Sequence, residues 1–560
     1  MTVNRSILSS TSIFVLASLA HAGDAPRFHV DASAPGGDGS SWAQSFRHLQ
    51  DGLQAARDYL QTGEGPVEVW VAAGTYRPDQ DAANPTGTND RNARFEMALD
   101  VTVLGGFQGD EDSALDRPLH DPAHASILTG EIGAPGPWDN SYNVVSNRDL
   151  GNPTGPYERW PVLNGFTVEA GNADGGGFLQ QGGGYYAKGT HGIIANCVLR
   201  ENQAYLQGGG LALATGSSSV IEVHNTRIED NVAQEGGGIF ALAGNLSLSQ
   251  CRISGNRARP RGFVTSAGGG LLILATATLQ QCTVVDNQAS FGGAFWAHSS
   301  SVVDAHNSIL HGNVATHGPS GQGYTKGVLT VRNCAIGGGL DDLQIDGGTL
   351  NALGTLVEDD PQFVAADAGD FRLNISSPCG DQADFNWVPN DLADVDQDGN
   401  VLEIVSRDLA GNPRLGGNAF DIGAYEARHH VPTYCESLGN SVSDDGAKIR
   451  AEGSLSERDA DLNFIADSTP NTFGLFVLGV DQTQTPFGDG YLCVGGQKSR
   501  LAPVRASQRT MVYEVDWNAP AIQAELQVGQ VRHVQAWYRD MAAGGAGFNT
   551  SDALTIEIVP

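Results

Sequence analysis

The stretch Cys251-Arg-Ile-Ser-Gly-Asn256 and its successor Cys282-Thr-Val-Val-Asp-Asn287 decide the fold, because they are two copies of one template. Each copy begins with a small residue, carries an aliphatic residue two places on, and ends in Asn, with Ala two residues later. Three more copies begin at Cys197, Thr226 and Ser308. The template therefore recurs at roughly 25 to 31 residues, a period that indicates a repeat architecture.

A second element lies between successive copies of the template. It is a glycine cluster followed by apolar residues, as in Gly208–Leu213, Gly236–Phe240 and Gly268–Ile273. Short runs with alternating, β-branched residues are typical of strands. A repeat of this length is too short for a propeller blade of ~40 to 45 residues. We therefore predict an all-β coil of short parallel strands, one turn per repeat, most regular over residues 164–336.

Stacked turns place equivalent residues in columns about 4.8 Å apart. The Asn column is expected at the bend after each strand, where Asn tolerates the left-handed conformation and its amide can bond along the stack. It consists of Asn202, Asn231, Asn256, Asn287 and Asn313. Cys197, Cys251, Cys282 and Cys334 share another column, so they cannot converge on a zinc ion and are interpreted as buried free thiols.

The flanks of the repeats differ from the coil itself. The helical spacing over 46–60 predicts a short helix that caps the first turn, and Phe363, 371–373 and 419–425 are expected to form the last, less regular turns. After Glu426 the glycine triplets end, and alternating runs predict a separate antiparallel β-sandwich. The expected domains are thus a β-helix over 23–428 and a sandwich over 429–560.

Residues 1–22 have the pattern of a cleaved signal peptide: Arg5, an apolar run over 13–16, and the site Ala20-His21-Ala22. No other uncharged apolar run is long enough to span a membrane. We expect a protein that is secreted or at the cell surface, with outer-membrane association left open. In such a compartment a disulfide between Cys435 and Cys493 is plausible.

The residues also resemble a known group. Gly292-Gly-Ala-Phe295 and the elements Ile228–Asn231 and Ile253–Asn256 are similar to the GGA[ILV] and FxxN repeats of polymorphic outer-membrane proteins, with an aliphatic residue in place of Phe. The segments 70–76 and 420–426 look like exported bacterial proteins of the pectate-lyase-like superfamily. The resemblance implies a right-handed parallel β-helix. Pro486–Gly490 and Trp537–Asp540 are similar to a domain often appended to such proteins.

Polysaccharide lyases of this shape typically combine calcium-binding acids with a basic residue. Glycoside hydrolases need a pair of carboxylates. The candidate acids are the pairs at 341–342 and 359–360, and the candidate bases are His191 and His317. They form no recognisable constellation, and Asp359-Asp360-Pro361 is interpreted as a turn. No catalytic residue is assigned, and the chain is expected not to be an enzyme.

Two ligand signals remain. Asp394, Asp396 and Asp398 are spaced two apart before Gly399, as in calcium loops, and they predict a structural Ca²⁺ site against the alternative of a solvated acidic turn. The second signal is a set of aromatic residues that follow glycine clusters. They could stack on sugar rings, or they could simply pack against the core or a face of the coil. They are Tyr185, Tyr186, Phe295 and Trp296.

The net charge of the chain excludes some classes of binding partner. With 64 acidic and 32 basic residues the formal net charge is −32, which argues against nucleic acid and anionic membranes. The sequence favours a non-enzymatic exported β-helix that presents an acidic surface for adhesion or for binding carbohydrate or cell-envelope components. A lyase or glycoside hydrolase acting on an acidic polysaccharide is the alternative.

Overall fold

The structure is a computed structural model that describes residues 25–62, 65–119, 122–151, 160–214, 219–318, 321–374, 376–391, 404–405, 407–412, 414, 419–427, 433–443, 445–452, 462–527 and 529–558. The predicted signal peptide over 1–22, the calcium loop at Asp394, Asp396 and Asp398, and the domain boundary at 428–429 lie outside these residues. They stay predictions. In the described part of the chain, no helix has the length and apolar character needed to cross a membrane.

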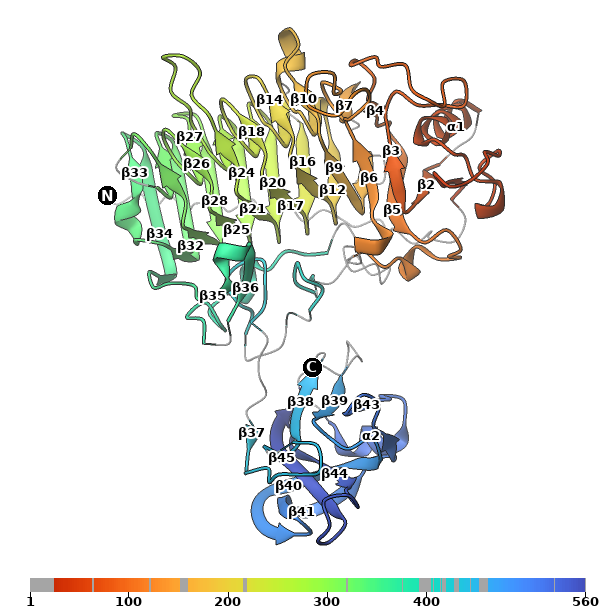
Figure 1. The fold of residues 1–560 in the computed structure, drawn as a ribbon. Coiled ribbons are helices and arrows are strands. Elements are labelled where there is room, and N and C mark those ends of the chain that lie inside the picture. Colours follow the sequence, from red (N-terminus) through yellow and green to blue (C-terminus); the bar gives the residue numbers. More distant parts are fainter. Residues whose placement is uncertain are drawn as a thin grey trace, which may run out of the picture.

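The largest sheet, sheet A, is parallel and runs the length of the coil (Figure 1). Each strand pairs with its equivalents on the two neighbouring turns. For example, β21 (Arg252–Ser254), which follows Cys251, pairs with β17 (Arg227–Glu229) and with β25 (Thr283–Val285). The strands of sheet A are β1 (Arg27–Val30), β2 (Val67–Ala72), β3 (Gly74–Tyr76), β5 (Val101–Phe107), β6 (Ser126–Thr129), β8 (Val162–Asn164), β9 (Phe166–Glu169), β12 (Gly192–Ala195), β13 (Val198–Arg200), β16 (Val220–His224), β17 (Arg227–Glu229), β20 (Asn245–Ser249), β21 (Arg252–Ser254), β24 (Thr276–Gln280), β25 (Thr283–Val285), β28 (Val302–His306), β29 (Ile309–His311), β32 (Val328–Ile336) and β34 (Thr349–Val357).

Two further parallel sheets, B and C, complete the coil, and sheet C is confined to its middle turns. The strands of sheet B are β4 (Phe95–Glu96), β7 (Val145–Gly151), β11 (Tyr185–Thr190), β15 (Leu211–Ala214), β19 (Ile239–Ala241), β23 (Leu271–Ile273), β27 (Phe295–Ala297), β31 (Gly323–Thr325) and β33 (Leu343–Ile345). Those of sheet C are β10 (Asn172–Ala173), β14 (Gln203–Ala204), β18 (Val232–Ala233), β22 (Arg257–Ala258), β26 (Gln288–Ala289) and β30 (Val314–Ala315). Three parallel sheets wound in one direction confirm the predicted coil.

The Asn column is a hydrogen-bonded ladder inside the coil. Asn256 shows the pattern: its Oδ1 accepts the backbone N–H and Nδ2–H of Asn231, at 3.0 Å each, and its Nδ2 donates to Asn287 Oδ1 at 2.9 Å. The prediction that Asn itself takes the left-handed conformation is wrong. The residue before each ladder Asn does so, as Asp230 with φ 55° and Asp286 with φ 55°, because the Asn backbone N–H must point along the coil axis to reach the next amide.

The core is apolar and continuous from the first turn to β33. The aliphatic column that the repeats predict lies in it, including Ile228, Ile253 and Val284. Cys197, Cys251, Cys282 and Cys334 are buried and free, as interpreted from the sequence. Burial raises the pKa of the Cys197 thiol to about 12, so these thiols are inert packing groups.

The predicted cap is helix α1 (Leu49–Thr62), at the red end of the coil in Figure 1. It buries Leu49, Leu53 and Ala56 against the first strands. A Cβ at Gly52 would lie 2.7 Å from a methyl group of Val30. Glycine therefore lets this helix approach the sheet closely enough to cover the open first turn.

The segment after β34 does not continue the coil, which corrects the expectation of further turns. β35 (Phe363–Ala365) and β36 (Asp370–Leu373) form an antiparallel hairpin, and the following chain lies across the outside of sheet A. The Gly423 N–H donates to the Asn307 carbonyl at 2.8 Å, and the Ala424 N–H donates to Thr283 Oγ1 at 3.0 Å. We call residues 376–427, as far as they are described, the strap.

A buried charge cluster fastens the strap. Arg414 Nη1 lies 2.8 Å from Glu426 Oε1 with both side chains buried, and Asp408 Oδ2 accepts the Glu426 N–H at 2.9 Å. Burial raises the pKa of Glu426 well above its usual range, and nearby Asp421 raises it further. The segment 420–426, noted in the sequence for its resemblance, is thus an anchor.

The C-terminal residues form two antiparallel sheets that share a core of their own (blue in Figure 1). One contains β37 (Thr433–Tyr434), β45 (Phe548–Glu557), β44 (Val531–Arg539), β40 (Phe473–Phe487), β41 (Gly490–Arg500) and β42 (Val504–Arg505). The other contains β38 (Lys448–Glu452), β39 (Asn463–Asp467) and β43 (Thr510–Glu514), and α2 spans Pro520–Glu525. This is the predicted sandwich.

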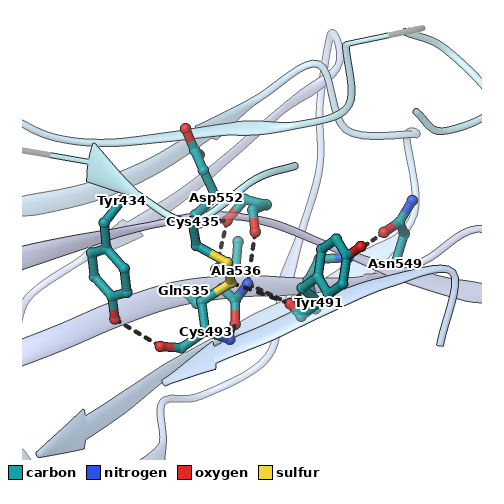
Figure 2. The surroundings of a disulfide bond; sticks show 10 residues. Tyr434, Cys435, Tyr491, Cys493, Gln535, Ala536, Asn549 and Asp552 are labelled. Carbon is teal, nitrogen blue, oxygen red and sulfur yellow. Dashed lines mark hydrogen bonds between the residues drawn. A yellow bond between two sulfur atoms is a disulfide. The ribbon is translucent and has the colours of Figure 1, made fainter. Parts of the chain in front are cut away.

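Cys435 and Cys493 are joined by a disulfide, with Cα atoms 6.1 Å apart (Figure 2). The surrounding bonds hold β41 in place: the Cys493 N–H donates to Gln535 Oε1 at 2.9 Å, and Tyr434 Oη donates to the Cys493 carbonyl at 2.8 Å. The disulfide ties the start of this domain to the β40–β41 hairpin.

Candidate functional site on the outer face of sheet B

The outer face of sheet B carries an aromatic pair on adjacent turns. Trp296 in β27 is in register with Tyr324 in β31. Gly292, with φ 61°, makes the sharp turn that precedes β27. Side chains alternate along a strand, so Phe295 points into the core and Trp296 points outward.

The two rings lie nearly parallel. Their centroids are 6.0 Å apart and their planes differ by 4°. This separation exceeds direct stacking contact, so the rings are offset and part of each face is not covered by the other. Both side chains are partly exposed. Phe291 meets Tyr324 edge-on at 6.2 Å. We call Phe291, Trp296 and Tyr324 the aromatic platform.

Polar groups border the platform on one side. Tyr324 Oη donates to Asp346 Oδ2 at 2.5 Å, and Lys326 Nζ lies 3.3 Å from the same oxygen. The hydrogen bond from Tyr324, together with Lys326, lowers the pKa of Asp346, while the bond to Asp346 raises the pKa of Lys326. His298 lies beside Trp296, with ring centroids 6.0 Å apart. The arrangement combines apolar ring faces with charged donors and acceptors, which is what a sugar ring needs.

The structure separates the four aromatic residues that the sequence singled out. Tyr185 and Phe295 are core residues, so the sugar-stacking interpretation is wrong for them. Tyr186 points outward but is buried in an apolar cluster with Phe240 and Leu272. Only Trp296 is partly exposed. Phe291 and Tyr324 were missed, although Tyr324 follows Gly323 and lies one turn from Trp296.

Three of the candidate catalytic residues, His191, Asp342 and Asp360, have local structural roles. His191 Nδ1 accepts the Val220 N–H at 3.1 Å, and its ring stacks on Trp160 at 4.4 Å. Asp342 Oδ1 accepts the Gly321 N–H at 3.0 Å. Asp360 Oδ1 accepts the Gln362 N–H at 2.9 Å, which is a turn, as the sequence indicated.

His317 is the one candidate base that lies beside the platform. Its ring centroid is 6.2 Å from that of Phe291, and its Nδ1 lies 3.0 Å from Thr316 Oγ1. Among the described residues, no group of three or more His, Cys, Asp or Glu side chains could hold a metal ion.

Comparison with known proteins bears on the coil. A family model described as a right-handed β-helix region matches residues 164–348. The solved structure of pectate lyase Pel9A aligns with a TM-score of 0.40 and 13% identity, over 72% of this chain and 97% of that chain; a likeness this weak says nothing about activity. The search of curated proteins gave no match. Residues 164–348 thus form a right-handed parallel β-helix region, continued toward both ends by the strands of sheets A and B.

Proposed function

We propose that the protein is an exported, non-enzymatic β-helix that binds carbohydrate at the aromatic platform and thereby adheres to polysaccharide or other cell-envelope material. The observation that carries the proposal is the parallel, partly exposed pair Trp296 and Tyr324 beside Asp346 and Lys326. Aromatic side chains offer apolar faces of fixed orientation, and they gain contact area at a low cost in conformational entropy.

The coil supports this function mechanically. Both rings are attached to strands of a sheet that is hydrogen-bonded on both sides, since β27 pairs with β23 and β31, and β31 pairs with β33. A site on regular strands is held more precisely than a site on loops. Export itself rests on the predicted signal peptide over 1–22.

The test is a binding titration of the protein with a panel of neutral and acidic oligosaccharides, followed by calorimetry. Trp296→Ala and Tyr324→Ala should each weaken binding of the recognised sugar about tenfold, which corresponds to about 1.4 kcal/mol. Trp138→Ala is the matched control, because Trp138 is 83% exposed and distant in sequence from the platform. Equal affinity of all three variants and the wild type would overturn the platform as the site.

The alternative function, a lyase or hydrolase on an acidic polysaccharide, is tested with the same substrates. Lyase activity would appear as absorbance of unsaturated uronate products, and hydrolase activity as new reducing ends. We expect neither product. Turnover that His317→Ala abolishes would replace the binding proposal with an enzymatic one.

A further inference from the structure

The larger sheet of the C-terminal domain has an aromatic outer face. On β40 and β44 the residues Phe476, Leu478, Val534, Ala536 and Tyr538 belong to the core. Side chains alternate along strands, so Phe473 and Trp537 point to the opposite face. Phe548 begins β45 on the same face, because its ring lies 5.7 Å from that of Trp537.

The rings of Trp537, Phe548 and Phe487 form a continuous row, and Phe473 lies on the same face of the sheet. Phe487, at the end of β40, lies 5.1 Å from Phe548, ring centroid to ring centroid. Phe473 is 54% exposed and Phe487 is 39% exposed, and Trp537 and Phe548 are partly exposed. Isolated exposed apolar residues are normal on protein surfaces, but a contiguous aromatic patch marks an interaction site.

The two motifs noted at 486–490 and 537–540 meet at this patch, and the chain holds it rigidly. Gly488 has φ 65°, and a Cβ there would lie 2.2 Å from the Phe548 ring. Asp489 Oδ1 accepts the Ala546 N–H at 2.9 Å, which ties the β40–β41 turn to the loop before β45. The rings are therefore positioned before any ligand arrives.

Two arginines border the rings. The Arg505 guanidinium lies 5.6 Å from the Phe473 ring centroid. Arg539 is in register with Phe548. On the other side Tyr538 pairs with Gly474, so the next residues along the two strands, Arg539 and Phe473, are also opposite each other. Both arginines are exposed, and within the described residues neither has a carboxylate at ion-pair distance.

We propose that this face, formed by Phe473, Trp537 and Phe548 with Arg505 and Arg539, binds a carboxylated saccharide. Aromatic faces bury the apolar side of a sugar ring. A guanidinium pairs with a carboxylate in bidentate fashion, and it does so better than an ammonium group. The acidic chain as a whole repels extended anionic surfaces, so a ligand that reaches only this patch fits better than a membrane or a nucleic acid. The site is separate from the platform and does not depend on the proposed function.

The experiment uses the mature full-length protein with its disulfide intact, titrated with a uronic acid tetramer and with the same tetramer methyl-esterified at every carboxyl group. We expect the esterified form to bind at least tenfold more weakly. Trp537→Ala and the double variant Arg505→Ala/Arg539→Ala should each weaken binding of the acid tetramer at least tenfold. Arg261→Ala, on an exposed loop of the coil, should leave binding unchanged.

Trp537→Phe keeps an aromatic ring and should retain affinity within about threefold, which separates loss of stacking from loss of folding. Equal binding of the acid and esterified tetramers would overturn the proposal. So would loss of binding in Trp296→Ala together with full binding in Trp537→Ala, because that result places the site on the coil. A concentration-dependent dimer, detected by sedimentation and broken by Trp537→Ala, would assign the face to self-association and would also overturn it.

Discussion

Asn256→Ala tests whether the Asn ladder stabilises the coil or merely fills it. Asn256 is completely buried. Its Oδ1 is the acceptor for the Asn231 backbone N–H, and its Nδ2 donates to Ile228 O at 2.8 Å and to Asn287 Oδ1 at 2.9 Å. Alanine removes these partners without offering a substitute.

The expected cost follows from the bonds lost. An orphaned buried donor costs about 1–3 kcal/mol, and each further lost bond costs about 0.5–1.5 kcal/mol. With one orphaned backbone N–H, two lost donations and the lost bond from Asn231 Nδ2–H, Asn256→Ala should destabilise the coil by about 2.5–7.5 kcal/mol. Gln288→Ala is the matched control on a neighbouring turn, because Gln288 is exposed and its loss should stay within about 0.5 kcal/mol.

Urea unfolding followed by far-ultraviolet circular dichroism measures the free energy. Hydrogen exchange by mass spectrometry adds a local readout, since amides in the peptide containing Asn231 should lose protection first. An Asn256→Ala variant as stable as Gln288→Ala, with unchanged exchange at Asn231, would refute the reasoning that the ladder bonds carry stability.

Three shorter predictions concern the disulfide, the free thiols and Glu426. Cys435→Ser/Cys493→Ser should destabilise the C-terminal domain by about 4 kcal/mol, because the bond closes a loop with a sequence separation of 58; denaturant unfolding of that domain measures it. The five free cysteines, all buried, should react with a thiol reagent only after denaturation; reaction in the native state would contradict this. Burial raises the folded-state pKa of Glu426, so its contribution to stability is present below the unfolded pKa near 4.3 and is lost as the pH rises through the folded pKa. Melting temperatures from pH 5 to 8 should therefore fall more steeply in the wild type than in Glu426→Gln.

The coil was predictable because its information is periodic. A residue such as Ile253 meets Ile228 and Val284, its equivalents in the neighbouring copies of the template. Once the repeat is found, the strand pairing, the core column and the buried thiols follow from one geometric rule. The repeat did not identify which residue at the bend has the left-handed backbone conformation. Both Asp and Asn tolerate that conformation, so only the hydrogen-bond geometry assigns it to Asp230 and not to Asn231.

The strap could not be predicted, since its contacts have no period. The Ala424 N–H bonds Thr283 Oγ1 across 141 residues of sequence, and Gln250 Nε2 bonds the Arg407 carbonyl across 157. None of these four residues lies in a sequence pattern that predicts its contact. The apolar runs at 419–425 resemble strands, and they were therefore interpreted as turns of the coil.

The aromatic platform shows how a coil builds a site from residues that look unrelated in sequence. Trp296 and Tyr324 lie one turn apart and pair in register, so any two outward positions at this spacing become neighbours. A repeat scaffold can therefore acquire a binding pair by two surface substitutions that leave the core untouched, whereas a site in the core would disturb the columns on both adjacent turns. For this reason the outer faces of the sheets, and not the regular columns of the template, are where function is expected in this protein. The C-terminal patch follows the same logic, with Phe548 and Trp537 on the outer face of a sheet whose inner face is fully used for packing.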